Sequence, residues 1–332
     1  MLYPAELLAL VGAAGFEPAT TWSQTRCATR LRYAPKKKSY KLCAYNSSIL
    51  LVNSCLILDG KHVAETSNKD LHARVENLKK NGRAPKLVAI IVGNDSASAT
   101  YVNMKEQACH NLGIKTEIKK LSGDTTTIEL ERIINELNSD TTVDGILLQH
   151  PVPSHINELK CFNAINLEKD VDGVTTQGFG NMSMGLDAFG SCTPLGIIRL
   201  LEHFKVELEG LNALVIGRSQ ILGKPMAAML LNKNATVTVA HSKTKNLGSS
   251  LQNYDLVVVA VGMPKFISAK DLKQGAILID AGYHPAEKCG DVDMTDISNI
   301  VSAYTPVPGG VGPMTINTLM MNTIKSMENK YE

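Results

Sequence analysis

The chain has 332 residues, of which 44% are hydrophobic and 20% charged, and its formal net charge is only +2. This length and composition are typical of a globular protein with two domains. The small net charge argues against a nucleic acid or a membrane surface as a partner, and the apolar run at 49–58 is too short to cross a bilayer. The seven cysteines form no C-x-x-C pair, which indicates reduced thiols, a cytoplasmic location and no metal site.

Residues 1–53 are predicted to lie outside the fold, because they show neither helical nor strand periodicity. The stretch at 11–35 resembles a transfer RNA gene translated by mistake, with Gly15-Phe16-Glu17-Pro18 encoded by the complement of its T-arm. A transit peptide is the alternative, since acidic residues are few. We expect the natural chain to begin near Leu51 or Val52. N-terminal mass spectrometry tests this start, and a peptide from residues 20–32 would contradict it.

Strands and helices alternate from residue 56 onward. Apolar periodicity and turn residues predict a strand and turn at 56–61, a helix at 68–81, a strand at 87–92, a helix capped by Asp95 or Ser96 that runs to 112, a strand at 115–121, a helix at 127–137 and a strand at 143–149. This alternation predicts an α/β domain with a parallel sheet. In such sheets ligands bind beyond the carboxyl ends of the strands.

Three polar residues are expected at that edge. Tyr101 and Lys105 are four residues apart and share one face of a helix, so an aromatic ring lies beside an amine. Gln149 ends a buried strand and is followed by two prolines that hold the loop. The alternative is a half-buried Tyr with a Lys extended over it, and a Gln bonded to backbone. His150 is interpreted as a packed or solvent-facing side chain.

The loop Lys169-Asp170-Val171-Asp172-Gly173 follows. Two carboxylates beside a glycine are typical of a turn. A carboxylate also accepts two N–H bonds from the amidine-like edge of a heterocycle. Both interpretations remain open from the residues alone.

A second α/β array begins after residue 190. We predict a helix at 195–204 with Thr193 as its N-cap, strands at 213–216, 236–240, 256–260 and 276–280, and a helix after the loop at 217–225. A glycine loop that opens a helix after the first strand suits a pyrophosphate at the helix N-terminus. The layout therefore predicts a Rossmann-like nucleotide-binding domain.

The second strand of this array ends in His241-Ser242-Lys243-Thr244, without the acidic residue that binds the ribose of NAD. Arg218 and Ser219 lie in the first loop. Cationic and hydroxyl groups favour a 2′-phosphate, and hence NADP, although a solvated basic loop is the alternative. Further along, residues 305–315 are dense in Pro and Gly, which indicates a fixed backbone that a ligand can approach closely. A largely apolar helix at 316–327 is expected to pack back on the first domain.

Seven motifs occur in order: Y-V-x-x-K from Tyr101, D-G-I-L-x-Q-x-P-x-P from Asp144, K-D-V-D-G from Lys169, C-T-P from Cys192, G-R-S-x-x-x-G-K-P from Gly217, H-S-K-T from His241 and T-P-V-P-G-G-V-G-P-M-T from Thr305. Together they resemble the bifunctional methylenetetrahydrofolate dehydrogenase/methenyltetrahydrofolate cyclohydrolase family. The resemblance covers the chain from about Leu56 to its end. Three departures concern the shape of the pocket: Ser191 replaces a frequent proline, an asparagine is missing from 174–179, and His150 stands where leucine is frequent.

The resemblance implies roles for individual residues. Lys105 is the catalytic lysine, Tyr101 stacks on the folate, Gln149 holds Lys105, and Asp172 bonds the pterin ring. The cofactor-binding set is Gly217, Arg218, Ser219, Gly223, His241 and Ser242, and the folate site is completed by Gly309, Gly310 and Pro313. The family also implies a homodimer and tetrahydrofolate derivatives as substrates.

The implied reaction is oxidation of 5,10-methylene-tetrahydrofolate with NADP, followed by hydrolysis to 10-formyl-tetrahydrofolate. The expected division is a folate-binding catalytic domain at 54–190 plus 306–330 and an NADP-binding domain at 191–305. Two alternatives remain: a dehydrogenase without cyclohydrolase activity, and a non-catalytic protein that binds folate or dinucleotide.

Overall fold

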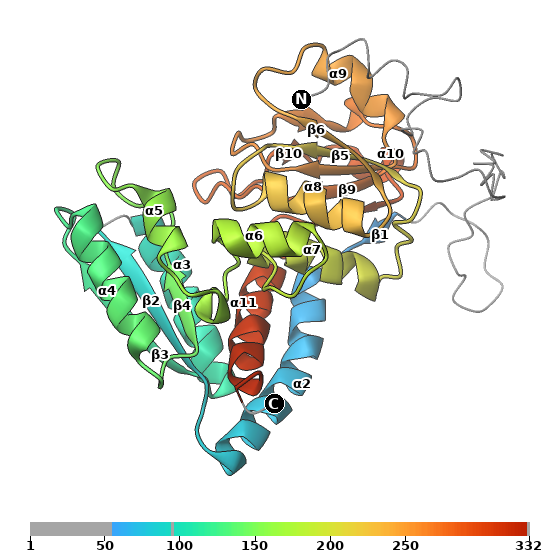
Figure 1. The fold of residues 1–332 in the computed structure, drawn as a ribbon. Helices are drawn as coiled ribbons and strands as arrows, with labels where there is room; N and C mark the ends of the chain where they lie inside the picture. The colour runs from blue at the N-terminus through green and yellow to red at the C-terminus, as the bar shows by residue number, and fades with distance from the viewer. Residues whose placement is uncertain (1–54, 94–95, 331–332) are drawn as a thin grey trace, which may run out of the picture. The chain divides into compact units, whose positions relative to one another are not determined.

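The computed structural model describes the backbone of residues 55–93 and 96–330, and their side chains except those of residues 96–101. The segment 1–53 and the proposed cap at Asp95 lie outside these residues. Two parallel sheets dominate the described part of the chain (Figure 1). The predicted α/β class with two sheet-based lobes is confirmed.

The first sheet has the strand order β3 (Lys115–Leu121), β2 (Lys86–Val92), β4 (Gly145–Leu148). Its central strand is buried along six of its seven positions because helices pack on both faces. One face packs on α2 (Gly60–Asn81), α3 (Ser96–Leu112) and α11 (Val311–Glu328), and the other on α4 (Thr127–Ser139) and α5 (Glu158–Asn163).

The second sheet has the order β1 (Leu56–Ile57), β11 (Ala303–Tyr304), β9 (Ile277–Asp280), β7 (Leu256–Val259), β5 (Asn212–Ile216), β6 (Thr236–Ala240). α7 (Cys192–His203) and α8 (Gly223–Asn232) pack on one face, and α9 (Leu247–Ser250) and α10 (Ile297–Ile300) on the other. The remaining elements are α6 (Thr176–Ser183), the 3-10 turns Leu167–Lys169, Leu251–Asn253 and Ala269–Asp271, and the parallel pair β8 (Ile267–Ser268) and β10 (Val292–Asp293). None of the described helices has the length and apolar character needed to span a lipid bilayer.

The predicted start of the first helix was wrong. α2 begins at Gly60, eight residues before the expected start at 68, and ends at Asn81 as predicted. The Asp59 carboxylate accepts the N–H of His62 at 3.0 Å, which is a side-chain N-cap. The segment before the helix also forms β1, whose backbone pairs with β11 in the second sheet rather than with the first.

Two further helices begin earlier than predicted. α7 begins at Cys192 after Ser191, so Thr193 lies in the first turn and is not the cap. α11 begins at Val311 inside the Pro- and Gly-rich stretch, rather than at residue 316. Pro313 is tolerated there because the first-turn N–H groups of a helix have no intrahelical partner.

α11 connects to both lobes through α2 and α7, as the expected return of the C-terminal helix requires. The Arg199 guanidinium of α7 donates to Thr318 Oγ1 and Asn317 Oδ1 of α11, each at 2.7 Å, and to Ser67 Oγ of α2 at 3.0 Å. One side chain therefore joins three helices.

Asp144 forms a second polar centre, at the residue just before β4. Its side chain is fully buried and accepts Arg83 Nη1 at 2.5 Å, Lys330 Nζ at 2.8 Å and the backbone N–H of Lys86 at 2.9 Å. Burial alone would raise the pKa of Asp144, but these hydrogen bonds and the charge of Lys330 bring the pKa below its ordinary value of 3.8. The carboxylate thus ties the chain just after α11 to the first sheet.

We expect Asp144→Asn to lower the free energy of unfolding by about 3 kcal/mol at pH 7, since it removes one partner of a buried ion pair. Urea unfolding followed by circular dichroism measures the loss. Because the folded-state pKa of Asp144 is lowered, its stabilisation is complete above pH 3.8 and is lost as the pH falls below that value. The difference between the two proteins should therefore shrink only in strong acid.

Glu136→Gln is the matched control, because Glu136 pairs with Arg132 where both side chains are at least 60% exposed. We expect it to change the free energy of unfolding by less than about 0.5 kcal/mol. An equal effect of both substitutions would contradict a special contribution from Asp144.

Candidate active site

Lys105 and Gln149 lie together at the carboxyl edge of the first sheet. Lys105 is on α3, which follows β2, and Gln149 directly follows the neighbouring strand β4. Lys105 Nζ donates to Gln149 Oε1 at 3.0 Å, while Gln149 Nε2 donates to the backbone oxygen of His150 at 2.7 Å. The second bond fixes the amide so that its oxygen faces the amine. Both side chains are half-buried, so the amine is partly withdrawn from water.

In the loop 169–173, two charged side chains are bonded to backbone groups and one remains accessible to a ligand. Lys169 is buried and donates to three backbone oxygens at the end of α4, including that of Asp140 at 2.8 Å. Asp170 is buried and accepts the N–H groups of Val174 and Thr175 at 3.0 and 2.9 Å. Asp172 is only half-buried, so it is the carboxylate of this loop that is accessible to a ligand.

Cys192 belongs to the same site, although sequence reasoning did not include it. It is 1% exposed, and its thiol donates to the backbone oxygen of Val171 at 3.3 Å. Burial, followed by the charge of Asp172 and a hydrogen bond with it, raises the pKa of Cys192 well above its ordinary value, and Lys105 opposes this rise. The neutral thiol of Cys192 therefore lies close to Lys105 and to Asp172, the two charged residues predicted for this site. The signal in the sequence was the C-T-P motif, which is the next of the seven motifs after the one that contains Asp172.

His150 lies at the same edge and pairs with Glu158. Its side chain is 45% exposed, and Nδ1 lies 2.7 Å from Glu158 Oε1. The hydrogen bond with Glu158 raises the pKa of His150, burial opposes the rise, and the charges of Glu158 and Asp172 add to it. The histidine is thus exposed, as the solvent-facing interpretation predicts, and it is paired with Glu158 and near Asp172.

The other predicted folate-site residues are placed as follows. Tyr101 lies one turn before Lys105 on α3, but its side chain lies outside the described residues. The Gly309 backbone oxygen accepts the N–H of Lys61 at 2.8 Å, and Gly310 precedes α11, whose first turn contains Pro313. Thr315 then donates to Thr193 Oγ1 at 3.1 Å, which brings the start of α11 to the first turn of α7.

The second sheet offers a separate binding edge. β5 pairs with β6 on one side and β7 on the other, so the chain reverses direction across the sheet at the boundary between β5 and β7. Dinucleotides bind at the carboxyl ends of strands at such a switch point. A Cβ at Gly217 would overlap the backbone oxygen of Ala260, and one at Gly223 would overlap that of Gly217. The two glycines therefore let the loop after β5 lie close against the end of β7.

The loops after β5 and β6 begin side by side at this edge, because Ile216 and Ala240, the last residues of the two strands, are register partners. Both loops carry basic and hydroxyl groups. Arg218 and Ser219 are exposed after β5, and half-buried His241 and exposed Ser242 follow β6. Ser219 Oγ also accepts the N–H of Gly223 at 3.3 Å, at the start of α8. No acidic residue follows β6 before Leu247, and the set is suited to a phosphate monoester.

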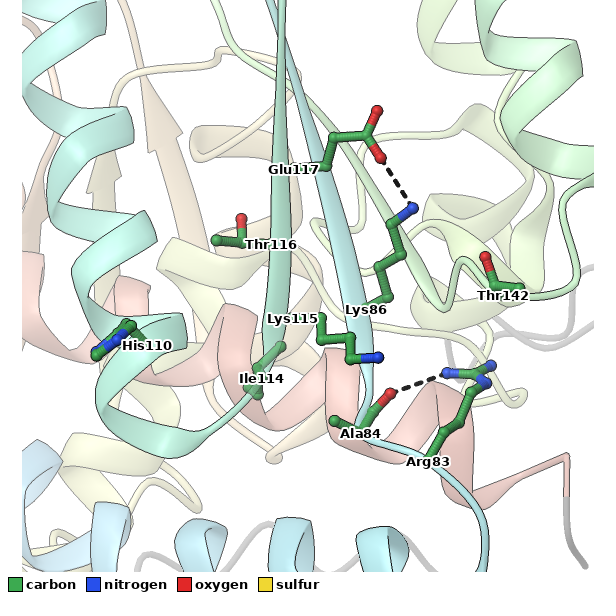
Figure 2. A pocket seen from close by; sticks show the side chains of 9 residues that line it. All are labelled: Arg83, Ala84, Lys86, His110, Ile114, Lys115, Thr116, Glu117 and Thr142. Carbon is green, nitrogen blue, oxygen red and sulfur yellow. Dashed lines mark hydrogen bonds and ion pairs between the residues drawn. The ribbon is translucent and has the colours of Figure 1, made fainter.

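A hollow of about 690 Å³ lies at the opposite edge of the first sheet, where β2 and β3 begin. Figure 2 shows Lys86, Lys115 and Glu117 around it, with Lys86 paired to Glu117 at 2.8 Å. Lys105, Gln149 and Asp172 are absent from its lining. The predicted chemistry therefore belongs to the carboxyl edge and not to this hollow.

Comparison with known protein families shows to which family these two domains belong. Residues 58–172 match the model of the tetrahydrofolate dehydrogenase/cyclohydrolase catalytic domain, and residues 191–331 match that of the tetrahydrofolate dehydrogenase/cyclohydrolase NAD(P)-binding domain. The chain belongs to the tetrahydrofolate dehydrogenase/cyclohydrolase family. The resemblance noted in the sequence is thereby confirmed.

Individual relatives of this family agree. The bifunctional protein FolD of Alcanivorax borkumensis is 56% identical over 277 residues, which are 83% of this chain and 98% of the relative. The crystal structure of the bifunctional FolD enzyme of Campylobacter jejuni has a TM-score of 0.81 and 42% identity, over 82% of this chain and 99% of that one. The FolD structure of Trypanosoma brucei, solved with NADP and an inhibitor, has a TM-score of 0.80 and 32% identity, over 84% and 99%.

Proposed function

We propose that this chain oxidises 5,10-methylene-tetrahydrofolate to the 5,10-methenyl compound with NADP and then hydrolyses that compound to 10-formyl-tetrahydrofolate. The observation that carries the proposal is the Lys105–Gln149 hydrogen bond of 3.0 Å, at the carboxyl edge of the catalytic-domain sheet and near Asp172. A protein that only binds folate or dinucleotide has no need of an amine held by an amide at this edge.

The oxidation requires orientation more than acid or base. NADP, when bound, supplies the two-electron oxidation of the methylene carbon. Asp172 is suited to accept two N–H bonds from the pterin edge, and Tyr101 to stack on its face. Together with the turn at Gly309, Gly310 and Pro313, these residues hold the substrate in one orientation.

The hydrolysis requires proton transfers, and Lys105 is the group that we assign to them. Water adds to the cationic methenyl carbon and loses one proton, which leaves a neutral hydroxyl adduct. The carbon–nitrogen bond to N5 then breaks as N5 gains a proton and the hydroxyl group loses its own, so one proton is released to solvent overall. An amine at this edge can take the proton from water and deliver one to N5. Gln149 positions the amine through its fixed amide oxygen.

The residues at the switch point fit NADP. Gly217 and Gly223 allow the backbone to approach the pyrophosphate at the start of α8. Arg218, Ser219, His241 and Ser242 supply a cation, hydroxyls and an imidazole for the 2′-phosphate, without an acid that would favour the free ribose of NAD.

We further propose that the chain works as a cytoplasmic homodimer. β6 is an edge strand of the second sheet, and the side chains of Val239 on β6 and Leu231 on α8 are 39% and 62% exposed. An exposed edge strand is a template for pairing with another chain. The described cysteines are free thiols, which suits a reducing compartment. Sedimentation equilibrium tests the dimer, and a monomer mass would contradict it.

The reaction is tested with the purified chain, 5,10-methylene-tetrahydrofolate and NADP, by following NADPH and the methenyl compound separately. We expect NADPH to form with little accumulation of the methenyl compound, because one site carries out both steps. Accumulation in step with NADPH would leave a dehydrogenase alone. Absence of NADPH would overturn the proposal in favour of a binding protein, and a parallel reaction with NAD tests the choice of dinucleotide.

Lys105→Met should lower the cyclohydrolase rate at least about 100-fold, the usual contribution of a general acid–base, and the dehydrogenase rate by much less. Both rates are measured on the same preparation, the first from added methenyl-tetrahydrofolate. The control is Lys120→Met, since Lys120 is exposed on β3 and should leave both rates unchanged. Equal losses of both activities in Lys105→Met would mean that Lys105 only binds substrate.

A further inference from the structure

Two buried carboxylates, Asp280 at the end of β9 and Asp291, lie beside the carboxyl end of β7, and the reaction proposed above does not use them. Asp280 and Asp291 are 1% and 0% exposed. Such groups are costly to bury unless they are fully hydrogen-bonded. Their partners are backbone N–H groups of the loops around the switch point.

Asp291 takes three consecutive backbone donors. Its Oδ2 accepts the N–H groups of Val261 at 2.6 Å and Gly262 at 3.0 Å, and its Oδ1 accepts the N–H of Met263 at 3.0 Å. His284 Nε2 also lies 2.9 Å from Oδ1. The loop that leaves β7 therefore takes its shape around one carboxylate that is distant in sequence.

Asp280 holds Asp291 in turn. Its Oδ1 accepts the N–H groups of Asp291 at 3.0 Å and Gly282 at 2.9 Å, and its Oδ2 accepts the N–H of Val292 at 2.9 Å. Burial raises the pKa of Asp280 to about 6, hydrogen bonds oppose the rise, and the charge of Asp291 adds to it. Asp280 is thus mainly ionised at neutral pH, where a carboxylate suits three donors.

Glycines permit this close packing. A Cβ at Gly282 would overlap the carboxylate of Asp291, and one at Gly290 would overlap that of Asp280. The loop at 281–291 is consequently fitted around both acids. Its backbone also accepts the N–H groups of Lys265 and Ile267 through the oxygens of Gly290 and Asp291, at 3.1 and 3.2 Å.

The loop at 261–263 lies beside the place assigned to the dinucleotide. It follows β7, which borders the switch point, and the preceding residue Ala260 is in close contact with Gly217 of the glycine loop. The 2′-phosphate of the adenosine half is assigned to residues after β5 and β6, and the pyrophosphate to the loop after β5. The loop after β7, on the other side of β5, is therefore next to the nicotinamide half of the dinucleotide. The 53% exposed Met263 side chain is available at this surface.

We propose that Asp291, itself held by Asp280, is a positioning residue that shapes the loop at 261–263 into one wall of the nicotinamide half of the dinucleotide site. This inference rests on the proposed use of NADP. It concerns the dehydrogenase step alone, because the hydrolysis of methenyl-tetrahydrofolate consumes no dinucleotide.

The test is Asp291→Asn, which keeps the side-chain shape but places an NH2 group against backbone N–H donors. We expect the NADPH dissociation constant, measured from NADPH fluorescence, to rise at least tenfold and the dehydrogenase rate to fall. The cyclohydrolase rate from added methenyl-tetrahydrofolate should stay within twofold. A variant that is merely unfolded would lose both rates, and an unchanged NADPH dissociation constant would overturn the proposal.

Asp293→Asn is the matched control. Asp293 lies two residues further on and accepts the N–H and hydroxyl of Thr295, at 3.1 and 2.8 Å. It should leave the NADPH dissociation constant and both rates within twofold. A loss equal to that of Asp291→Asn would contradict a specific contribution from Asp291.

Hydrogen–deuterium exchange on the unaltered chain gives an answer even where Asp291→Asn does not fold. We expect NADPH to slow exchange in a peptide that covers residues 256–266, and absence of added protection there would overturn the proposal. Protection by NADPH in a chain without dehydrogenase activity would instead support the wall and refute the proposed reaction. The two failures are thereby distinguishable.

Discussion

The polar side chains buried along α11 constrain much of the remaining structure, because each of them requires a hydrogen-bond partner at a fixed position along the helix axis. Asn317 donates to the backbone oxygen of Ala64 and to Asn68 on α2, and Asn322 donates to the backbone oxygen of Val171 at 2.8 Å. Ser326 donates to the backbone oxygens of Asp144 and Glu168. A shift of α11 by one turn would leave all of these groups unpaired, so the helix has one register.

This register reaches the candidate active site directly. The Val171 oxygen that Asn322 holds also accepts the thiol of Cys192, and Asp172 is the next residue. A helix from the end of the chain therefore fixes the backbone that presents the accessible carboxylate. Lys169 and Asp170 serve the same purpose from within the loop, where they pair with backbone groups and leave Asp172 to the ligand.

The sequence predicted the parallel strands and the Lys105–Gln149 edge well, because buried strands are short apolar runs and their ends are marked by Gly, Pro and polar residues. It predicted helix starts poorly. α2 begins at Gly60, directly after Asp59, where the residue types are typical of a turn, and α11 begins within a segment rich in Gly and Pro; in both helices the apolar period becomes visible only later. Asp280 and Asp291 were not predicted as a pair, since their partners are backbone N–H groups, which have no signature in the residue types. Cys192 was quoted only as part of a motif, because a lone cysteine does not reveal which charges the fold brings to it.

The pairing of β1 with β11 has a consequence for the order in which the protein is built. Leu56 is opposite Ala303, so one of the first described segments to leave the ribosome finds its strand partner only when almost the whole chain has been made. Contacts between such distant residues form late, because the intervening loop must be closed first. The three-stranded sheet has all its strands by residue 148, but one of its faces, on which α2 and α3 already pack, is not fully covered until α11 is added. Nascent chains that stall before residue 303 would therefore expose apolar surface on both lobes. The last tenth of the sequence covers that surface in both lobes, because it contains β11 and α11.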